Sequence, residues 1–339
     1  MASWMVKELL ERGYTVHAGV RDANDASKTR HLQELIRDNH QEEDHKNGEE
    51  TRQLKLFSTG ELGTDPLAFD AAMQGGVEAV FHVSIAMDRS NPEHGMFRAT
   101  LLGTRHLLQA MDRHSVSTLI LTSSTAAVPV TSGVLAEESN WLDLQEAKSQ
   151  GNWYGATKMT QEQMVMKWAS DLQHQQQQHQ STSIASKKSV HVVSMCPTRV
   201  LGPPISTSVP ISGWMSFLQK QLREGIEVPN DTIEFVHAQD VARLHIAALE
   251  KVLQLSDSSS STSERYLCAD ESWHWKDFTQ RLQELHPGMP VVQPYSGQDK
   301  LVAPKQYSTE KRKTLGVEFR SMDQILQESV EYLQSQGYI

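Results

Sequence analysis

The stretch WYGATK at residues 153–158 places Tyr154 four residues before Lys158. Apolar residues continue at helical spacing through Val165 and Trp168, so the pattern predicts an amphipathic helix. Residues four apart lie on one helix face, about one turn apart. A lysine ammonium near a phenol favours the phenolate, which lets the tyrosine exchange a proton near neutral pH. A tyrosine and a lysine that merely share a helix face have the same spacing, so the rest of the chain must decide.

Around this helix, apolar strands and amphipathic helices alternate along the chain. The alternation is typical of the α/β class with a Rossmann-type, doubly wound parallel sheet, which binds ligands at the carboxyl ends of its strands. We assign residues 1–200 to such a domain. Residues 201–339 are expected to form mostly a smaller mixed lobe that shapes a substrate pocket. The predicted strands are 15–20, 54–57, 79–83, 117–122 and 191–195, and the predicted helices before residue 153 are 3–12, 28–38, 66–73 and 96–114.

Two polar tracts interrupt this order. Residues 173–188 are rich in Gln, His and Ser and are predicted to be a disordered insertion, because such a composition buries little apolar area. A metal site at His174 and His179 is the alternative, but neither carboxylate nor Cys ligands accompany them. Residues 256–263 form a second polar loop. We therefore expect no metal.

Composition narrows the possible partners. The chain has 42 acidic and 32 basic residues, a net charge of -10 that argues against general binding to nucleic acid or to an anionic membrane. Its two cysteines imply no disulfide framework, which favours a reducing compartment. No apolar run approaches the roughly 18 residues of a membrane span, and the charged N-terminus does not match a signal peptide. We expect a soluble cytoplasmic protein with a small-molecule ligand.

Several short motifs occur in a fixed order along the chain: LLERGYTV at 9–16, VRD at 20–22, FHVS at 81–84, GT at 103–104, LTSS at 121–124, NWY at 152–154, VLGP at 200–203 and FVHAQDVA at 235–242. Together they resemble the extended short-chain dehydrogenase/reductases, in the branch of dihydroflavonol 4-reductases, cinnamoyl-CoA reductases and related fungal aldehyde/ketone reductases. The resemblance runs from Ala2 to the C-terminus, apart from the two polar tracts.

The resemblance implies hydride transfer from a nicotinamide to the carbonyl of a small molecule. Tyr154 would be the general acid, and Lys158 would lower the Tyr154 pKa and hold the nicotinamide ribose. Ser124 would hydrogen-bond the carbonyl oxygen and stabilise its developing charge. The family pattern places this role on Ser124 rather than on Ser123; the alternative for such a pair is a turn hydroxyl bonded to its own backbone.

The cofactor preference rests on cations after the second predicted strand. Arg21 and Lys28 match positions at which family members hold the 2'-phosphate of NADPH, although two solvated surface cations would look the same. Glu61 and Leu62 stand where the family has an Asp-Leu pair at the adenine. The remaining expected cofactor contacts are Val83, Ser84, Pro197 and Thr198, the last two at the carboxamide.

The start of the chain departs from the family. Family members begin with a strand and a Gly-x-x-Gly-x-x-Gly/Ala turn that cradles the pyrophosphate, whereas residues 2–4 match only the tail of that motif. The neighbouring strands should then face an unpaired gap, unless the sheet closes up. Either the chain begins at an internal methionine, or it is a truncated and catalytically impaired relative.

Three functions follow from these observations. The first is an NADPH-dependent aldehyde or ketone reductase. The second is a non-catalytic binding or regulatory scaffold, and the third is an epimerase or dehydratase that retains NAD. Neither the substrate nor the oligomeric state is indicated by the sequence.

Overall fold

The computed structural model describes residues 1–43, 53–178, 189–255, 261–290 and 300–339. Its centre is a four-stranded parallel sheet with the order β10-β6-β4-β3, which confirms the predicted α/β class. Every residue of β4 and β6 is buried, as expected for apolar strands covered on both faces. The strands are β3 (Ala79–His82), β4 (Thr118–Thr122), β6 (His191–Pro197) and β10 (Thr262–Cys268).

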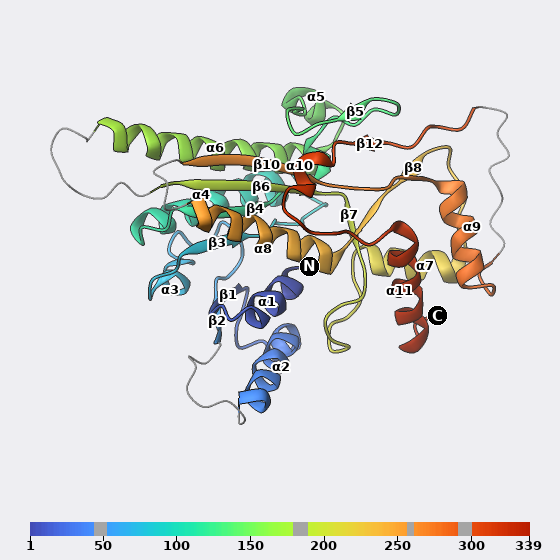
Figure 1. The fold of residues 1–339 in the computed structure, drawn as a ribbon, viewed down its shortest axis with the longest axis horizontal. Coiled ribbons are helices and arrows are strands. Elements are labelled where there is room, and N and C mark those ends of the chain that lie inside the picture. Colours follow the sequence, from blue (N-terminus) through green and yellow to red (C-terminus); the bar gives the residue numbers. More distant parts are fainter. Residues whose placement is uncertain (44–52, 179–188, 256–260, 291–299) are drawn as a thin grey trace.

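Helices cover both faces of this sheet (Figure 1). On one face lie α4 (Ala99–Arg113) and α6 (Trp153–Gln178), and on the other lies α8 (Ala238–Leu255). Side chains alternate along a strand, so Leu121 packs toward α4 and α6 whereas Ile120 packs toward α8.

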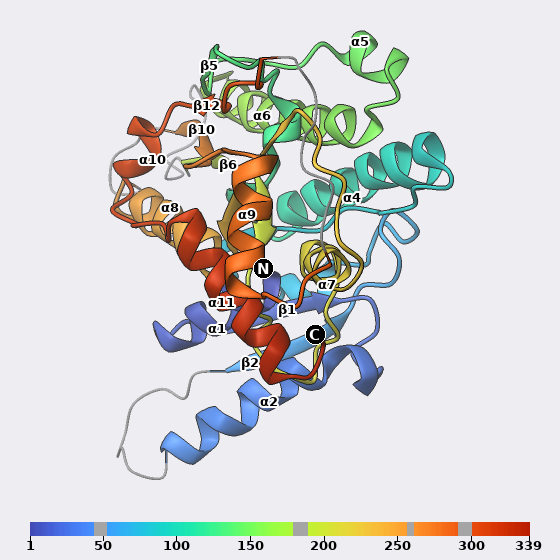
Figure 2. The ribbon, with the colours of Figure 1, turned by 90° about the vertical axis from the view of Figure 1, so that its right-hand side faces the viewer.

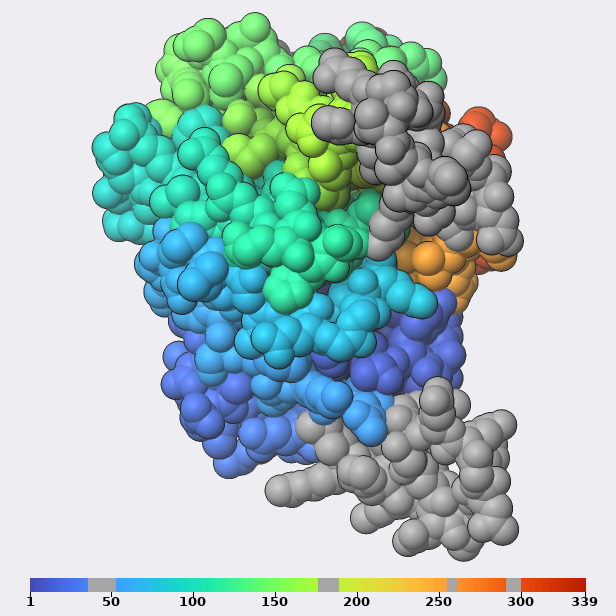
Figure 3. Space-filling view, turned by 90° about the vertical axis from the view of Figure 1, so that its left-hand side faces the viewer, coloured from blue at the N-terminus to red at the C-terminus, as the bar shows by residue number. Residues whose placement is uncertain are grey.

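A separate parallel pair, β1 (Val16–Val20) and β2 (Leu54–Ser58), lies beyond β3. Within the described ranges β1 does not pair with β3, so the sheet is interrupted there, the first of the two arrangements expected above. Most residues of β1 and β3 are only partly buried. The space-filling view shows the N-terminal residues, in blue, at one end of the molecule (Figure 3).

The helices α1 (Ala2–Glu11) and α2 (Ala26–Glu43) accompany this pair. Leu10 of α1, Leu32 of α2 and Leu54 of β2 form its small core. Helix α1 also packs on α8, which connects the two-stranded unit to the main sheet.

The C-terminal lobe has a core of its own, where α7 (Trp214–Glu224), α9 (Trp275–Leu285) and α11 (Met322–Ser335) gather (Figure 2). Three short two-stranded ladders complete the fold: β7 with β9, β8 with β11 and β5 with β12. The remaining bounds are α3 (Asp70–Met73), η1 (Pro92–Arg98), η2 (Thr125–Ala127), β5 (Leu135–Ala136), α5 (Leu144–Ser149), β7 (Arg199–Leu201), β8 (Thr232–Ile233), β9 (Phe235–His237), β11 (Trp273–His274), β12 (Gln306–Tyr307) and α10 (Glu310–Lys313).

Some predicted boundaries differ from the structure. The expected disordered insertion at 173–188 begins inside α6, which continues to Gln178; residues 179–188 lie outside the described residues. Glutamine is a good helix former, so a Gln-rich tract can prolong a helix. β10 belongs to the main sheet, although it falls within the 201–339 range expected to be mostly the substrate lobe. No helix among the described residues is long and apolar enough to cross a bilayer.

Candidate active site

The first turns of α6 meet the turn after β4. The Asn152 side chain accepts a hydrogen bond from the Gly155 amide at 3.0 Å, at the start of the helix. A Cβ on Gly155 would lie 2.4 Å from the Ala126 carbonyl oxygen, so only glycine allows this approach. The sequence thereby brings Tyr154, one residue earlier, toward Ser124.

The Ser124 side chain lies near enough to the Tyr154 phenol to affect its pKa. The Ser124 hydroxyl accepts a hydrogen bond from the Ala126 amide (3.1 Å) and donates to the Pro197 carbonyl (3.4 Å). The Tyr154 pKa is raised, chiefly by burial, while a side-chain hydrogen bond with Ser124 and the charge of Arg89 lower it. The phenol is therefore protonated at neutral pH. The cation that lowers this pKa is Arg89, and the expected contribution of Lys158 stays a prediction.

Lys158 is 2% exposed and points toward the end of β4. Its ammonium donates to the Thr122 carbonyl at 2.7 Å and to the Gln161 amide oxygen at 3.4 Å. Burial lowers the Lys158 pKa to about 8, although the carboxylate of Glu162 acts in the opposite direction. Near pH 8, half of the Lys158 side chains would therefore be neutral amines.

A buried polar network lies behind Lys158. The Gln161 amide nitrogen lies 2.9 Å from both His82 Nε2 and the Thr104 hydroxyl. Burial, with a smaller effect of the Lys158 charge, lowers the His82 pKa to about 3, so this histidine is neutral at physiological pH. These contacts fix Gln161, which in turn orients the ammonium.

The predicted cofactor cations are both paired. Arg21 Nε lies 2.9 Å from the Glu61 carboxylate, and Lys28 Nζ lies 2.9 Å from Asp25. Both cations are largely exposed, and exposed ion pairs contribute little, so either cation can exchange its partner for a phosphate. Leu62, expected at the adenine, instead packs on α4. A Cβ added to Gly103 of that helix would lie 2.3 Å from Leu62 Cγ.

The next candidate cofactor residue is Thr198, which the resemblance places at the nicotinamide carboxamide. Thr198 is 6% exposed, and its hydroxyl has no hydrogen-bond partner among the described residues. Since buried polar groups are almost always paired, this hydroxyl fits a ligand atom. Pro197 precedes it at the end of β6, while Val83 and Ser84 follow β3. The exposed cations Arg21 and Lys28 and the unpaired Thr198 hydroxyl are compatible with a bound nicotinamide dinucleotide.

Three further residues of this region were not predicted from the sequence. Arg89 acts electrostatically on the Tyr154 phenol, and nothing in the sequence points to it. Glu162 and Arg265 form a buried ion pair beside the Ser123–Ser124 turn. A signal for Glu162 did exist, since it extends the stripe of Tyr154 and Lys158 by one helical turn.

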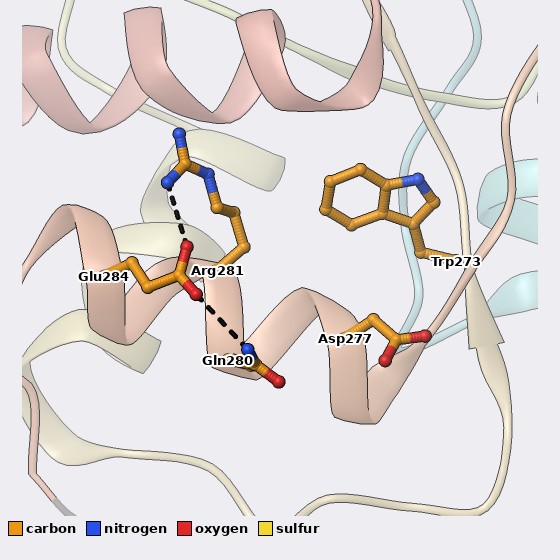
Figure 4. A pocket seen from close by; sticks show the side chains of 5 residues that line it. All are labelled: Trp273, Asp277, Gln280, Arg281 and Glu284. Carbon is orange, nitrogen blue, oxygen red and sulfur yellow. Dashed lines mark hydrogen bonds and ion pairs between the residues drawn. The ribbon is translucent and has the colours of Figure 1, made fainter.

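A hollow of about 320 Å³ lies elsewhere, on α9 of the C-terminal lobe (Figure 4). Its Arg281 and Glu284 side chains are paired with each other at 3.0 Å. None of the predicted site residues lines it, so we do not regard it as the active site. Its lining residues are Trp273, Asp277, Gln280, Arg281 and Glu284.

The fold and the site define a class. A parallel sheet with helices on both faces is the architecture of many α/β proteins that bind dinucleotides. The chain matches the NAD dependent epimerase/dehydratase family over residues 1–258, and it belongs to that family.

Similar proteins narrow the class further. Cinnamoyl-CoA reductase 2 of Arabidopsis thaliana is 31% identical, in an alignment covering 100% of this chain and 91% of the relative. An anthocyanidin reductase of Vitis vinifera is 28% identical, covering 100% and 94%. The yeast methylglyoxal/isovaleraldehyde reductase complexed with NADPH has a TM-score of 0.74 at 19% identity, covering 100% and 96%, which supports the fold alone. These relatives confirm the predicted reductase branch and support an oxidoreductase.

Proposed function

We propose that this protein reduces an aldehyde or ketone with NADPH. The observation that carries the proposal is the grouping of Ser124, Tyr154 and Lys158 near the end of β4: the Ser124 side chain acts on the Tyr154 phenol, and the Lys158 ammonium donates to the Thr122 carbonyl. The relatives named above are reductases, which agrees with this chemistry.

The cofactor supplies the hydride when bound, and the chain supplies orientation and a proton. Arg21 and Lys28 would hold the 2'-phosphate, and Pro197 and Thr198 the carboxamide end. Glu61 would border the adenine, whereas Leu62 packs on α4 instead. Val83 and Ser84 would line the passage between, and Lys158 would hold the ribose.

The proton comes from Tyr154. Its raised pKa keeps the phenol protonated at neutral pH, so Tyr154 Oη can donate its proton to the carbonyl oxygen. The Ser124 hydroxyl then stabilises the charge that develops on that oxygen.

The test is NADPH binding followed by NADPH oxidation with a panel of aldehydes and ketones. For Tyr154→Phe we expect turnover to fall by about 10²–10⁴-fold, the range for a lost general acid, with NADPH affinity little changed. Tyr332→Phe, in the C-terminal lobe, is the matched control. A variant that turns over as fast as the unmodified protein would contradict the role of Tyr154.

The same preparation separates the alternatives. NAD that stays bound through purification would favour an epimerase or dehydratase. A folded protein that binds no nicotinamide nucleotide would favour a non-catalytic scaffold.

A further inference from the structure

Two buried charged side chains outside the proposed catalytic set, Glu162 on α6 and Arg265 on β10, make many hydrogen bonds. Glu162 is fully buried, and the Arg265 side chain is 4% exposed. Arg265 Nε donates to Glu162 Oε2 at 2.8 Å, and its terminal nitrogen Nη2 donates to Oε1 at 3.1 Å. This is a bidentate contact, the strongest geometry available to such a pair.

The rest of the guanidinium holds the main chain. Nη1 donates to the carbonyls of Glu138 (3.1 Å) and Asn140 (2.5 Å), and Nη2 donates to that of Ala127 (3.3 Å). The guanidinium also stacks on Trp141, 3.9 Å from the ring centroid. All five N–H groups of an arginine are therefore in use. Ala127 ends the η2 turn that begins directly after Ser124.

The carboxylate reaches the other side of the same turn. The Ser123 hydroxyl donates to Glu162 Oε1 at 2.6 Å, and the Cys196 thiol lies 3.6 Å from Oε2. Ser123 precedes Ser124, and Cys196 precedes Pro197, whose carbonyl accepts from the Ser124 hydroxyl.

Stability alone does not account for this arrangement. Desolvation of two buried charges can cancel their attraction, and buried pairs can often be replaced by apolar side chains without loss of stability. What the pair does provide is position: its contacts lie before and after Ser124, and Glu162 is on the helix face of Tyr154 and Lys158.

We infer that Glu162 and Arg265 are positioning residues that hold the Ser124 turn against the Tyr154–Lys158 helix. The inference rests on the proposed function. Neither residue needs to touch the substrate, because both act through the main chain at 123–127 and through α6. A displacement of about 1 Å between reacting groups can cost about 10²-fold in rate.

The test uses the double variant Glu162→Met/Arg265→Met, because a single replacement leaves a buried charge unpaired and can prevent folding. Arg312→Met is the matched control: Arg312 is likewise buried and lies 4.0 Å from the Phe319 ring centroid, but it contacts no catalytic segment. We expect the double variant to fold and to lose about 10²-fold in kcat, with KM for NADPH unchanged. Amide hydrogen exchange at 123–128 should be faster than in the unmodified protein and in the control.

The two readouts separate this inference from the proposed function. A folded double variant with unchanged kcat, or with unchanged exchange at 123–128, would overturn the positioning role. If the unmodified protein reduces no carbonyl, the proposed function fails, and the exchange experiment alone then decides whether the pair holds the turn.

Discussion

Lys158 combines a charge with nearly complete burial. Its ammonium has the Thr122 carbonyl and the Gln161 amide as partners, and burial still lowers its pKa from the ordinary 10.5 to about 8. The unfolded chain therefore binds more protons than the folded one between pH 8 and 10.5, and linkage makes the stability of the folded state rise with pH in that window.

We predict the effect of Lys158→Met from this linkage. Below about pH 8 the unmodified protein carries the full penalty of the buried ammonium; between pH 8 and 10.5 it gains stability relative to the variant, on the order of 3 kcal/mol in all. Urea unfolding of both proteins from pH 7 to 10 measures the difference. Lys167→Met, on an exposed part of the same helix, is the control. A difference that stays constant over this range would refute the lowered pKa.

The sequence predicted the candidate catalytic residues better than their surroundings. The resemblance to a known family named Ser124, Tyr154 and Lys158; the structure brings these side chains to one region, and their roles stay predictions. The sequence could not reveal that burial raises the Tyr154 pKa, because desolvation depends on elements distant in sequence. Arg265 was missed for the same reason, since its five hydrogen bonds come from segments 103–138 residues away.

At the scale of elements, one buried carboxylate of α1 makes several polar contacts with α8. Glu8 accepts hydrogen bonds from Gln239 (2.8 Å) and Arg243 (3.0 Å) of α8, and it pairs with Arg12 at 2.7 Å. On the exposed side of the same helix, Glu11 pairs with Lys7, its one ion-pair partner in the described part of the chain.

Replacing each glutamate should therefore have unequal effects. We expect Glu8→Ala to destabilise the protein by roughly 1–3 kcal/mol, since it removes a buried acceptor with several donors, and Glu11→Ala by about 0.5 kcal/mol or less. Chemical denaturation of the two variants measures the contrast. Equal losses would show that Glu8 does not dock the helix.

The order of elements followed from hydrophobic periodicity, but their limits and pairings did not. The helix expected at 66–73 is only Asp70–Met73, and the one expected at 96–114 is preceded by the π-helical turn η1. The main-sheet position of β10 depends on pairing with β6, some 70 residues earlier, which no local pattern encodes.

At the scale of the whole molecule, the sheet consists of two parts of unequal burial. Residues of β4 and β6 are buried throughout, whereas β1 and β2 form an isolated pair with mostly partial burial. Two-stranded units are marginally stable by themselves and depend on packing against helices.

This asymmetry predicts uneven hydrogen exchange. Amides of β1 and β2 should open at lower free energy than those of β4 and β6, and should exchange at least about tenfold faster, because local stability follows burial. Mass spectrometry of exchange at several times measures both regions in one sample. Equal protection would mean that the two-stranded unit opens only with the whole fold.

The Glu162–Arg265 pair also constrains how this sequence can change over evolutionary time. Losing either partner alone leaves the other charge buried without compensation, a state that is strongly destabilised. Exchanging both for apolar residues removes that penalty, but it passes through an unfit intermediate unless the two changes arrive together. Descendants of this chain that keep the proposed activity should therefore keep both residues, and replacement of both is expected only where the activity is lost, so that the two positions covary across its lineage.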